Sequence, residues 1–119
     1  MARILVIDDE QEIRIVLRKI LERAGYEVIG ASDGREGIAC YRQEPADVVL
    51  TNIVMPEKDG LEVIRELKRN FPDVKTIAMS ANPIYLPLAI DLGAQFAISK
   101  PFVSQTLVDM VEKLVGLTL

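Results

Sequence analysis

The chain has 119 residues, of which 50% are hydrophobic and 27% are charged, a balance typical of a single folded globular domain. Its net charge of −4 argues against general binding to nucleic acid or to anionic lipid. The only cysteine, Cys40, excludes an internal disulfide and favours a reducing cytoplasm. The lack of histidine excludes histidine-based catalysis and histidine metal sites. The sequence shows no signal peptide and no apolar run of the roughly 18 residues that a membrane span needs.

The chain begins with a strand pattern followed by a helix pattern. Residues 4–7 form a continuous apolar, largely β-branched run, which predicts a buried strand. Hydrophobic residues then recur on one helical face over residues 13–24, and Gly25 follows as a C-cap. A second strand is predicted over residues 27–31.

The next unit contains the stretch around which the rest of the chain is organised. Asp33 and Glu36 have the spacing of a capping box and open a helix that ends before Pro45. A third strand is predicted over residues 47–51, and Asn52 stands at its C-terminal end. In open α/β sheets this end of a strand is where ligands are held.

After Asn52 the chain breaks at Met55-Pro56 and turns at Asp59-Gly60. A helical face follows over residues 61–71, and a fourth strand is predicted over residues 76–79. This strand ends at Ser80. The pattern therefore repeats the order of strand, polar strand end and helix seen earlier in the chain.

Two prolines four residues apart, Pro83 and Pro87, interrupt the fourth unit. Both cannot lie inside one regular helix, because an interior proline costs about 3 kcal/mol. We expect a short helix that starts near Pro87, and we interpret the pair as a loop irregularity in preference to a recognition motif. A fifth strand over residues 96–99 precedes Lys100, and a last amphipathic helix spans residues 107–115.

Five strand–helix units in strict alternation predict an α/β fold, a doubly wound parallel sheet of five strands with helices on both faces. No repeat, low-complexity tract or linker interrupts the sequence. We therefore expect residues 1–119 to form one domain.

Polar side chains with the potential for chemistry stand at the ends of these strands. Asp8 and Asp9 follow the first strand, Asn52 ends the third, and Ser80 and Lys100 follow the fourth and fifth. The C-terminal ends of parallel strands meet at one edge of the sheet. Two carboxylates, an amide, a hydroxyl and an ammonium at that edge suit Mg²⁺ together with a phosphoryl group.

The combination of these motifs resembles the receiver domain of response regulators, the CheY-like family with a flavodoxin-like (βα)5 fold. The resemblance covers essentially the whole chain, and the motifs are specific only in combination. They are Asp8-Asp9, Asn52-Ile53-Val54-Met55-Pro56 with Asp59-Gly60, Ser80-Ala81, and Lys100-Pro101-Phe102.

The resemblance implies a Mg²⁺ site at the strand ends. By position, Asp9 would bind the ion directly and Asp8 would act more through water. Residue 52 and the backbone carbonyl of Val54 would complete the protein ligands. The family's function is to receive a phosphoryl group in two-component signalling, and the donor is a sensor histidine kinase or a phosphotransfer protein.

The resemblance also implies a switch. Ser80 and Lys100 would bind the phosphoryl oxygens and shift the fourth helix, fifth strand and fifth helix, a surface that is a candidate for homodimer formation. The Lys100–Pro101 bond is expected to be cis. The output would pass to an effector, fused or separate, with no direct binding of nucleic acid by this chain.

Two positions depart from the family pattern. Asn52 stands where the family has the phosphoryl-accepting Asp, and an amide oxygen is a far poorer nucleophile than a carboxylate, so this chain should not accept a phosphoryl group at residue 52. The site also loses one negative charge, which at about 4 Å is worth roughly 4 kcal/mol at an effective dielectric of about 20, so Mg²⁺ should bind more weakly. Ala97 replaces the Tyr or Phe that receivers often carry, which places aromatic switching in doubt.

Three functional classes follow from this pattern. The first is a phosphoryl-accepting switch held off by an introduced Asp→Asn change at residue 52, which the intact acids and lysine favour. The second is a pseudo-receiver, in which the Asp was lost naturally and partners bind without phosphorylation. The third, a Mg²⁺-dependent enzyme, is the weakest because no glycine-rich phosphate loop follows the first strand and no histidine base is present. Cys40 is interpreted as a structural thiol.

Overall fold

The structure is a computed structural model and describes residues 1–116, over which strands and helices alternate. The strands are β1 (Arg3–Ile7), β2 (Glu27–Ala31), β3 (Val48–Asn52), β4 (Thr76–Ser80) and β5 (Phe96–Ser99). The helices are α1 (Gln11–Arg23), α2 (Gly34–Gln43), α3 (Gly60–Asn70), α4 (Leu86–Asp91) and α5 (Ser104–Gly116), with a 3-10 turn, η1 (Pro83–Tyr85), before α4.

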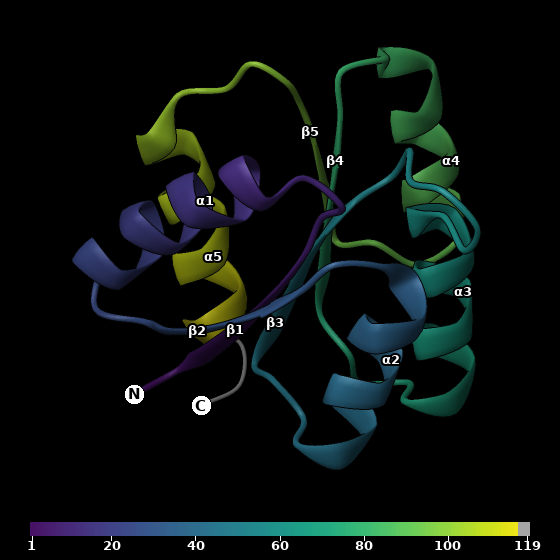
Figure 1. Ribbon diagram of the computed structural model, residues 1–119, viewed down its shortest axis with the longest axis horizontal. Coiled ribbons are helices and arrows are strands. Elements are labelled where there is room, and N and C mark those ends of the chain that lie inside the picture. Colours follow the sequence, from purple (N-terminus) through teal and green to yellow (C-terminus); the bar gives the residue numbers. More distant parts are fainter. Residues whose placement is uncertain (117–119) are drawn as a thin grey trace.

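The strands form one parallel sheet in the order β2-β1-β3-β4-β5 (Figure 1). β1 pairs with β2 on one side and with β3 on the other, so Ile4 is opposite both Val28 and Val48. This is the strand order of flavodoxin-like folds, in which ligands bind beyond the C-terminal ends of the strands where the order reverses. The predicted five-stranded doubly wound fold is confirmed.

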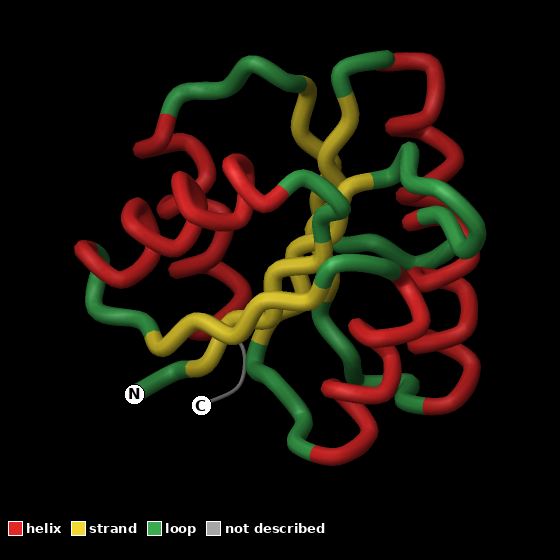
Figure 2. The backbone as a smooth tube through the Cα atoms, viewed as in Figure 1, coloured by secondary structure: helices red, strands yellow, loops and turns green. Residues whose placement is uncertain are grey.

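The sheet is buried between two layers of helices. Figure 1 shows α1 and α5 on one face and α2, α3 and α4 on the other, and Figure 2 shows the strands running through the middle. Successive residues of β1 face opposite helix layers. Ile4 belongs to the same hydrophobic cluster as Leu17 of α1, whereas Leu5 belongs to the same cluster as Val63 of α3. Burial on both faces explains why the strands are continuous apolar runs.

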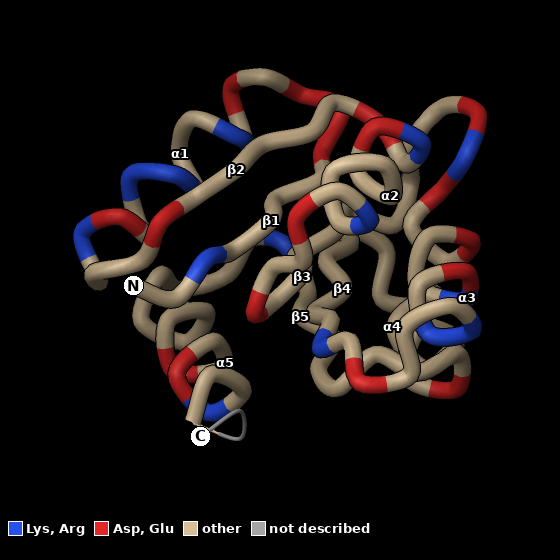
Figure 3. The backbone as a smooth tube through the Cα atoms, turned by 90° about the horizontal axis from the view of Figure 1, so that it is seen from below, with Lys and Arg blue, Asp and Glu red and all other residues tan. Residues whose placement is uncertain are grey.

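Charged residues lie mainly on the helices and on the loops that join them (Figure 3). β3 and β4 contain no charged residue, as expected for central strands covered on both faces. None of the helices formed by residues 1–116 combines the length and the apolar character needed to cross a membrane.

Side-chain caps fix where α2 and α3 begin. The Asp33 carboxylate accepts the backbone N–H of Glu36, as the capping-box spacing predicts, and Asp59 accepts the N–H of Glu62 in the same way. Such caps typically stabilise a helix by about 1 kcal/mol. At the end of α1, Gly25 adopts a φ of 96°, a left-handed conformation that glycine reaches without strain.

The two prolines lie in the first turns of two successive short helices. Pro83 opens η1, and Pro87 lies in the first turn of α4, which begins at Leu86. The prediction of a helix starting near Pro87 was therefore right to within one residue. The interpretation of residues 83–85 as irregular loop was wrong, because a proline at the start of a helical turn sacrifices no needed N–H. Asn82 caps η1 by accepting the N–H of Ile84 at 3.1 Å.

Candidate functional site

The polar strand ends meet at one edge of the sheet. Asp8 follows β1, Asn52 ends β3, Ser80 ends β4 and Lys100 follows β5. Because β1, β3, β4 and β5 are consecutive in the sheet, these residues are brought close together although up to 92 positions separate them. Asp8 is fully buried, and Asn52 and Ser80 are 8% and 1% exposed, so these polar side chains form a buried cluster at the edge of the sheet.

Lys100 joins the first and third strand ends. Its Nζ donates to Asn52 Oδ1 at 3.0 Å and to Asp8 Oδ2 at 3.4 Å. The Lys100–Pro101 peptide bond is cis, as predicted. The Lys100 side chain is 21% exposed, and its ammonium neutralises the buried Asp8 carboxylate, which would be costly to bury alone.

Asn52 uses both ends of its amide. Oδ1 accepts from Lys100, and Nδ2 donates to the backbone carbonyl of Val54 at 2.9 Å. The carbonyl predicted to ligate Mg²⁺ is thus bonded to the Asn52 amide, while the Val54 side chain is exposed. This hydrogen bond between the Asn52 side chain and the Val54 carbonyl ties the start of the β3–α3 loop to the end of β3.

The two acids differ in their surroundings. Asp8 Oδ1 accepts the backbone N–H of Glu10 at 2.9 Å, and its backbone carbonyl accepts from Arg14 at 2.6 Å. With Lys100 on Oδ2, each oxygen of Asp8 has a partner. Asp9 is exposed, which leaves it as the acid whose carboxylate is open to a ligand.

Ser80 is buried at the end of β4, and its Oγ accepts the backbone N–H of Asn82 at 3.0 Å. The structure therefore joins Asp8, Asn52 and Lys100 by direct hydrogen bonds, whereas Ser80 lies at the same edge with a partner of its own. A hydroxyl that accepts one hydrogen bond still has its own hydrogen to donate.

The β3–α3 loop is held very close to the end of β3. The N–H of Gly60 donates to the carbonyl of Ile53 at 2.7 Å, and a Cβ on Gly60 would lie 2.2 Å from the backbone oxygen of Asn52. Only glycine fits this approach. Within the loop, Glu57 adopts a φ of 62°, and the ammonium of Lys58 pairs with Glu66 of α3.

Sequence reasoning missed Arg14, which contacts the acid pair. The pattern of α1 places Arg14 on the polar side of an amphipathic helix, where an arginine normally faces solvent. The one available signal is its place in the second turn after the acids, within reach of the strand end. The sequence pattern at Asp59-Gly60 predicts only a turn. It does not predict that Asp59 caps α3 or that Gly60 lies close to the backbone of Asn52.

Oxygen atoms of the kind that Mg²⁺ prefers, carboxylates together with neutral oxygens, stand at this edge of the sheet. The candidates are the carboxylates of Asp8 and Asp9, the amide oxygen of Asn52 and the carbonyl of Val54. Among residues 1–116 no cluster of three or more His, Cys, Asp or Glu side chains is placed to hold a metal.

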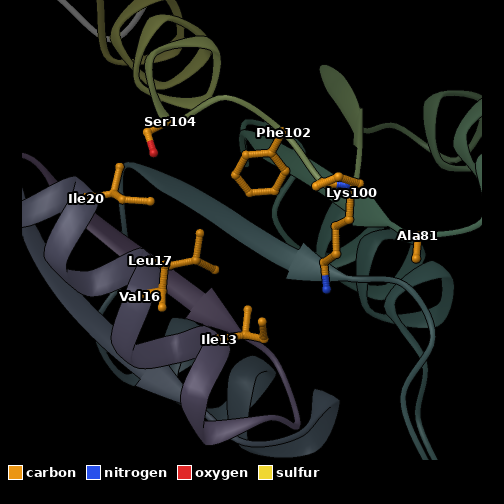
Figure 4. A pocket seen from close by; sticks show the side chains of 9 residues that line it. Ile13, Val16, Leu17, Ile20, Ala81, Lys100, Phe102 and Ser104 are labelled. Atoms are coloured by element: carbon orange, nitrogen blue, oxygen red, sulfur yellow. The ribbon is translucent and has the colours of Figure 1, made fainter.

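An apolar cleft of about 410 Å³ borders the site (Figure 4). Residues of α1 form one wall, and Phe102 of the β5–α5 connection and Ser104 at the start of α5 lie opposite them. Its lining residues are Ile13, Val16, Leu17, Ile20, Ala81, Lys100, Pro101, Phe102 and Ser104. The cleft therefore places the apolar side chains of α1 next to Lys100, whose ammonium contacts Asn52.

The position where receivers often carry an aromatic residue holds Ala97, which is half-buried in β5 and packs beside Ile53 and Ala78. No ring is present there to change rotamer. Cys40 packs partly buried against the cluster beneath α2, and burial raises the pKa of its thiol, as does the nearby Glu36 carboxylate. Both features fit a thiol that serves packing.

Comparisons with known proteins identify the family. The model for the response regulator receiver domain matches residues 4–112. Chemotaxis protein CheY of Thermotoga maritima is 37% identical over 114 residues, which cover 93% of this chain and 95% of that protein. A receiver domain from Clostridium thermocellum superposes with a TM-score of 0.94 at 31% identity, over 99% of this chain and 97% of that one.

Response regulator TrrA of Thermotoga maritima was solved in complex with Mg²⁺ and BeF, and it superposes with a TM-score of 0.91 at 36% identity, over 96% of this chain and 99% of that one. The chain therefore belongs to the response regulator receiver domain family, whose members are signalling modules of two-component systems that bind Mg²⁺ and interact with histidine kinases or phosphotransfer proteins.

Proposed function

We propose that this chain is the receiver of a two-component phosphorelay in a form that cannot be phosphorylated at residue 52. The observation that carries the proposal is the contact of Lys100 Nζ with Asn52 Oδ1 at 3.0 Å. An ammonium in this place would hold an oxygen of a phosphoryl group attached to residue 52. The parent form has Asp there, and Asn52 blocks the transfer.

In the parent form the carboxylate of an Asp at position 52 would attack phosphorus. A bond forms between a carboxylate oxygen and phosphorus, the bond from phosphorus to the donor histidine breaks, and the imidazole leaves with the electron pair and takes up a proton. The product is an acyl phosphate. The amide of Asn52 has no anionic oxygen for this step, and its nitrogen is already bonded to Val54.

The Mg²⁺ ligands in this proposal are Asp9, Asp8 through water, the oxygen of residue 52 and the Val54 carbonyl. The ion neutralises negative charge on the phosphoryl oxygens when it is bound. In this chain Asn52 weakens that site, because the Val54 carbonyl is occupied by the amide and one carboxylate is lost.

The output would pass through Ser80 and Asn82. The Ser80 hydroxyl can accept the N–H of Asn82 and at the same time donate its own hydrogen to a phosphoryl oxygen. Asn82 also caps η1, which leads directly into α4. A movement of Ser80 toward a phosphoryl group would therefore pull on the start of the α4-β5-α5 surface. Because Ala97 has no ring, this backbone route would act without an aromatic switch.

Two surfaces support protein partners. The apolar cleft between α1 and Phe102 borders Lys100, so a phosphodonor protein seated there would have its histidine near residue 52. On α4 and the turn before it, Ile84, Leu88 and Ile90 are 67%, 47% and 45% exposed. These side chains are candidates for contact with a second copy or with an effector, fused or separate.

One observation favours a second candidate, a natural pseudo-receiver that binds partners without phosphorylation. Both ends of the Asn52 amide are satisfied by protein groups, so the site can close and be neutralised without a phosphoryl group. In that case the surface of α4 would be displayed permanently in one conformation.

The test is the intact mass of this chain and of Asn52→Asp after exposure to a small acyl phosphate with Mg²⁺. We expect Asn52→Asp to gain one phosphoryl group and this chain to gain none, since only the variant has a nucleophilic carboxylate. Omission of Mg²⁺ with EDTA present is the control, and it should abolish the gain.

The other outcomes decide between the candidates. If neither protein gains mass, the site lacks the remaining machinery and the pseudo-receiver is favoured. If both gain mass, an acceptor other than residue 52 is in use, and the role assigned to Asn52 is wrong.

A further inference from the structure

Two arginines of α1 reach back to the sheet, one turn apart. Arg14 donates from its NH1 to the backbone carbonyl of Asp8 at 2.6 Å, and Arg18 donates from its NH1 to the backbone carbonyl of Val28 at 3.0 Å. Both side chains also pass over Gly30, with atoms 3.5 to 3.9 Å from the place where a Cβ would stand. They therefore make the same kind of contact with the same layer of the fold.

Only Arg14 contacts the acid pair. The carbonyl carbon of Asp8 is bonded to the nitrogen of Asp9, and a peptide group is planar, so holding this carbonyl fixes the plane of the Asp8–Asp9 peptide. On the other side of Asp9, the N–H of Glu10 is held by Asp8 Oδ1 at 2.9 Å. The backbone of Asp9 is thus anchored at both neighbouring peptide groups.

This anchoring matters because no hydrogen bond or ion pair holds the exposed Asp9 side chain among the described residues. The backbone therefore fixes the direction of its Cα–Cβ bond, and with it the positions that the carboxylate can reach. Arg18 does not anchor this backbone, because the carbonyl that it contacts belongs to Val28 of β2, away from the acids.

We propose that Arg14 is a positioning residue for the Mg²⁺ site: by holding the Asp8 carbonyl it orients the Asp9 carboxylate toward residue 52. This inference rests on the proposed function, since it requires that the parent form with Asp at position 52 binds Mg²⁺. Residues that orient metal ligands in this way typically contribute about 10- to 100-fold to metal affinity.

The experiment compares Arg14→Met with Arg18→Met, each in the Asn52→Asp background. Methionine preserves most of the side-chain volume over Gly30 and removes the charge and the hydrogen bond. Mg²⁺ is titrated and followed by the amide resonances of residues 8–10 and 52–54. We expect Arg14→Met to raise the Kd for Mg²⁺ about tenfold and Arg18→Met to change it less than about twofold. Thermal melting verifies that each variant is folded.

Arg14→Lys provides the rescue arm. Lysine can donate a hydrogen bond to the Asp8 carbonyl in place of Arg14, so part of the lost affinity should return, which a loss of packing alone would not explain. If Arg14→Met does not fold, Arg14→Lys compared with Arg18→Lys becomes the test, with a smaller loss expected only at position 14.

A second measurement needs no metal. In the chain with Asn52, Arg14→Met should shift the amide resonances of Asp9 and Glu10, and Arg18→Met should leave them in place. Equal effects of the two methionine variants on Mg²⁺ affinity, or no effect of either, would overturn the inference while leaving the proposed function intact. Failure of Asn52→Asp itself to bind Mg²⁺ would overturn both.

Discussion

At the scale of single residues, the side-chain atom of residue 52 that faces the Val54 carbonyl determines whether a cation is needed between the two groups. The Asn52 Nδ2 is a donor and lies 2.9 Å from the Val54 carbonyl. In an Asp form, the atom in that place would be an acceptor facing another acceptor, and the negative charge near Asp8 would increase. A cation between the two oxygens removes this conflict. Asn52 removes it without one.

This difference predicts how stability depends on Mg²⁺. At a Mg²⁺ concentration of about ten times its Kd, binding should stabilise Asn52→Asp by about 1.4 kcal/mol, equivalent to a rise in Tm of roughly 5 °C for a domain of this size. The chain with Asn52 should change by less than about 1 °C. The measurement is thermal melting in Mg²⁺ against EDTA, with NaCl added to match ionic strength. An equal rise in both proteins would mean that Asn52 does not replace the ion.

At the scale of elements, the β3–α3 connection positions the site. It leaves β3 at Asn52, returns so closely that Gly60 touches the backbone of Asn52, and starts α3 with the Asp59 cap. The end of the strand and the start of the helix are therefore one unit. A change in this connection alters both the stability of α3 and the placement of residue 52.

Substitution of Gly60 by Ala should be strongly destabilising. The new Cβ would lie 2.2 Å from the backbone oxygen of Asn52 and 2.7 Å from the Cα of Ile53. These backbone atoms cannot move without displacing the end of β3. We expect a loss of roughly 2–3 kcal/mol in the free energy of unfolding, measured by urea denaturation.

Gly116→Ala is the matched control, because no other atom of the described residues lies within 4 Å of a Cβ on this glycine at the end of α5. It should be neutral or should stabilise by up to about 1 kcal/mol. Similar losses in the two variants would show that the close approach of Gly60 is not the cause.

The elements themselves were predictable from the sequence because each strand is an apolar run and each helix has an apolar face. The strand ends then followed from topology, so Asp8, Asn52, Ser80 and Lys100 were correctly expected at one edge. What could not be predicted depends on the local conformation of the folded backbone. That conformation sets the hydrogen bond from Arg14 to the Asp8 carbonyl and the one that Ser80 accepts from Asn82, although these partners are close in the chain.

A second gap concerned short helical turns. The two prolines suggest an irregular loop at residues 83–85, whereas in the structure Pro83 lies in a first helical turn that Asn82 caps. The sequence did not predict the partners of Asn52, because it does not reveal which end of the amide faces Lys100 and which faces the Val54 carbonyl.

At the scale of the whole molecule, the sheet has a separate hydrophobic layer on each face, and titratable groups within these layers link folding to pH. Tyr41 of α2 is 7% exposed, and its ring meets that of Phe71 edge-on at 4.9 Å. Burial raises the pKa of Tyr41 above its usual value, and the Asp47 and Asp73 carboxylates add to the effect.

A raised pKa in the folded state means that the folded protein holds its phenol proton more tightly than the unfolded chain. Stability from this group is complete below the ordinary tyrosine pKa of about 10 and is lost as the pH rises through the folded value. We expect the urea midpoint of the chain to fall above about pH 10, and the fall to be smaller in Tyr41→Phe.

Tyr26→Phe is the graded comparison. Its pKa is also raised by burial, with Glu112 contributing, but the side chain is only half-buried. The midpoints are measured from about pH 8 to about pH 11, on either side of the ordinary tyrosine pKa, and Tyr41→Phe should remove more of the alkaline loss than Tyr26→Phe. A reversed order would indicate that the layer under α2 does not control alkaline unfolding.

The contact between Lys100 and Asp8 also bears on when the site can exist. It joins residues 92 positions apart, and the two strands that carry them are linked through the intervening sheet. During synthesis, the acids emerge first and the lysine close to last. A nascent chain that ends before β5 therefore lacks the counter-charge of the Asp8 carboxylate. The hydrogen-bonded cluster becomes complete only after Lys100 has left the ribosome.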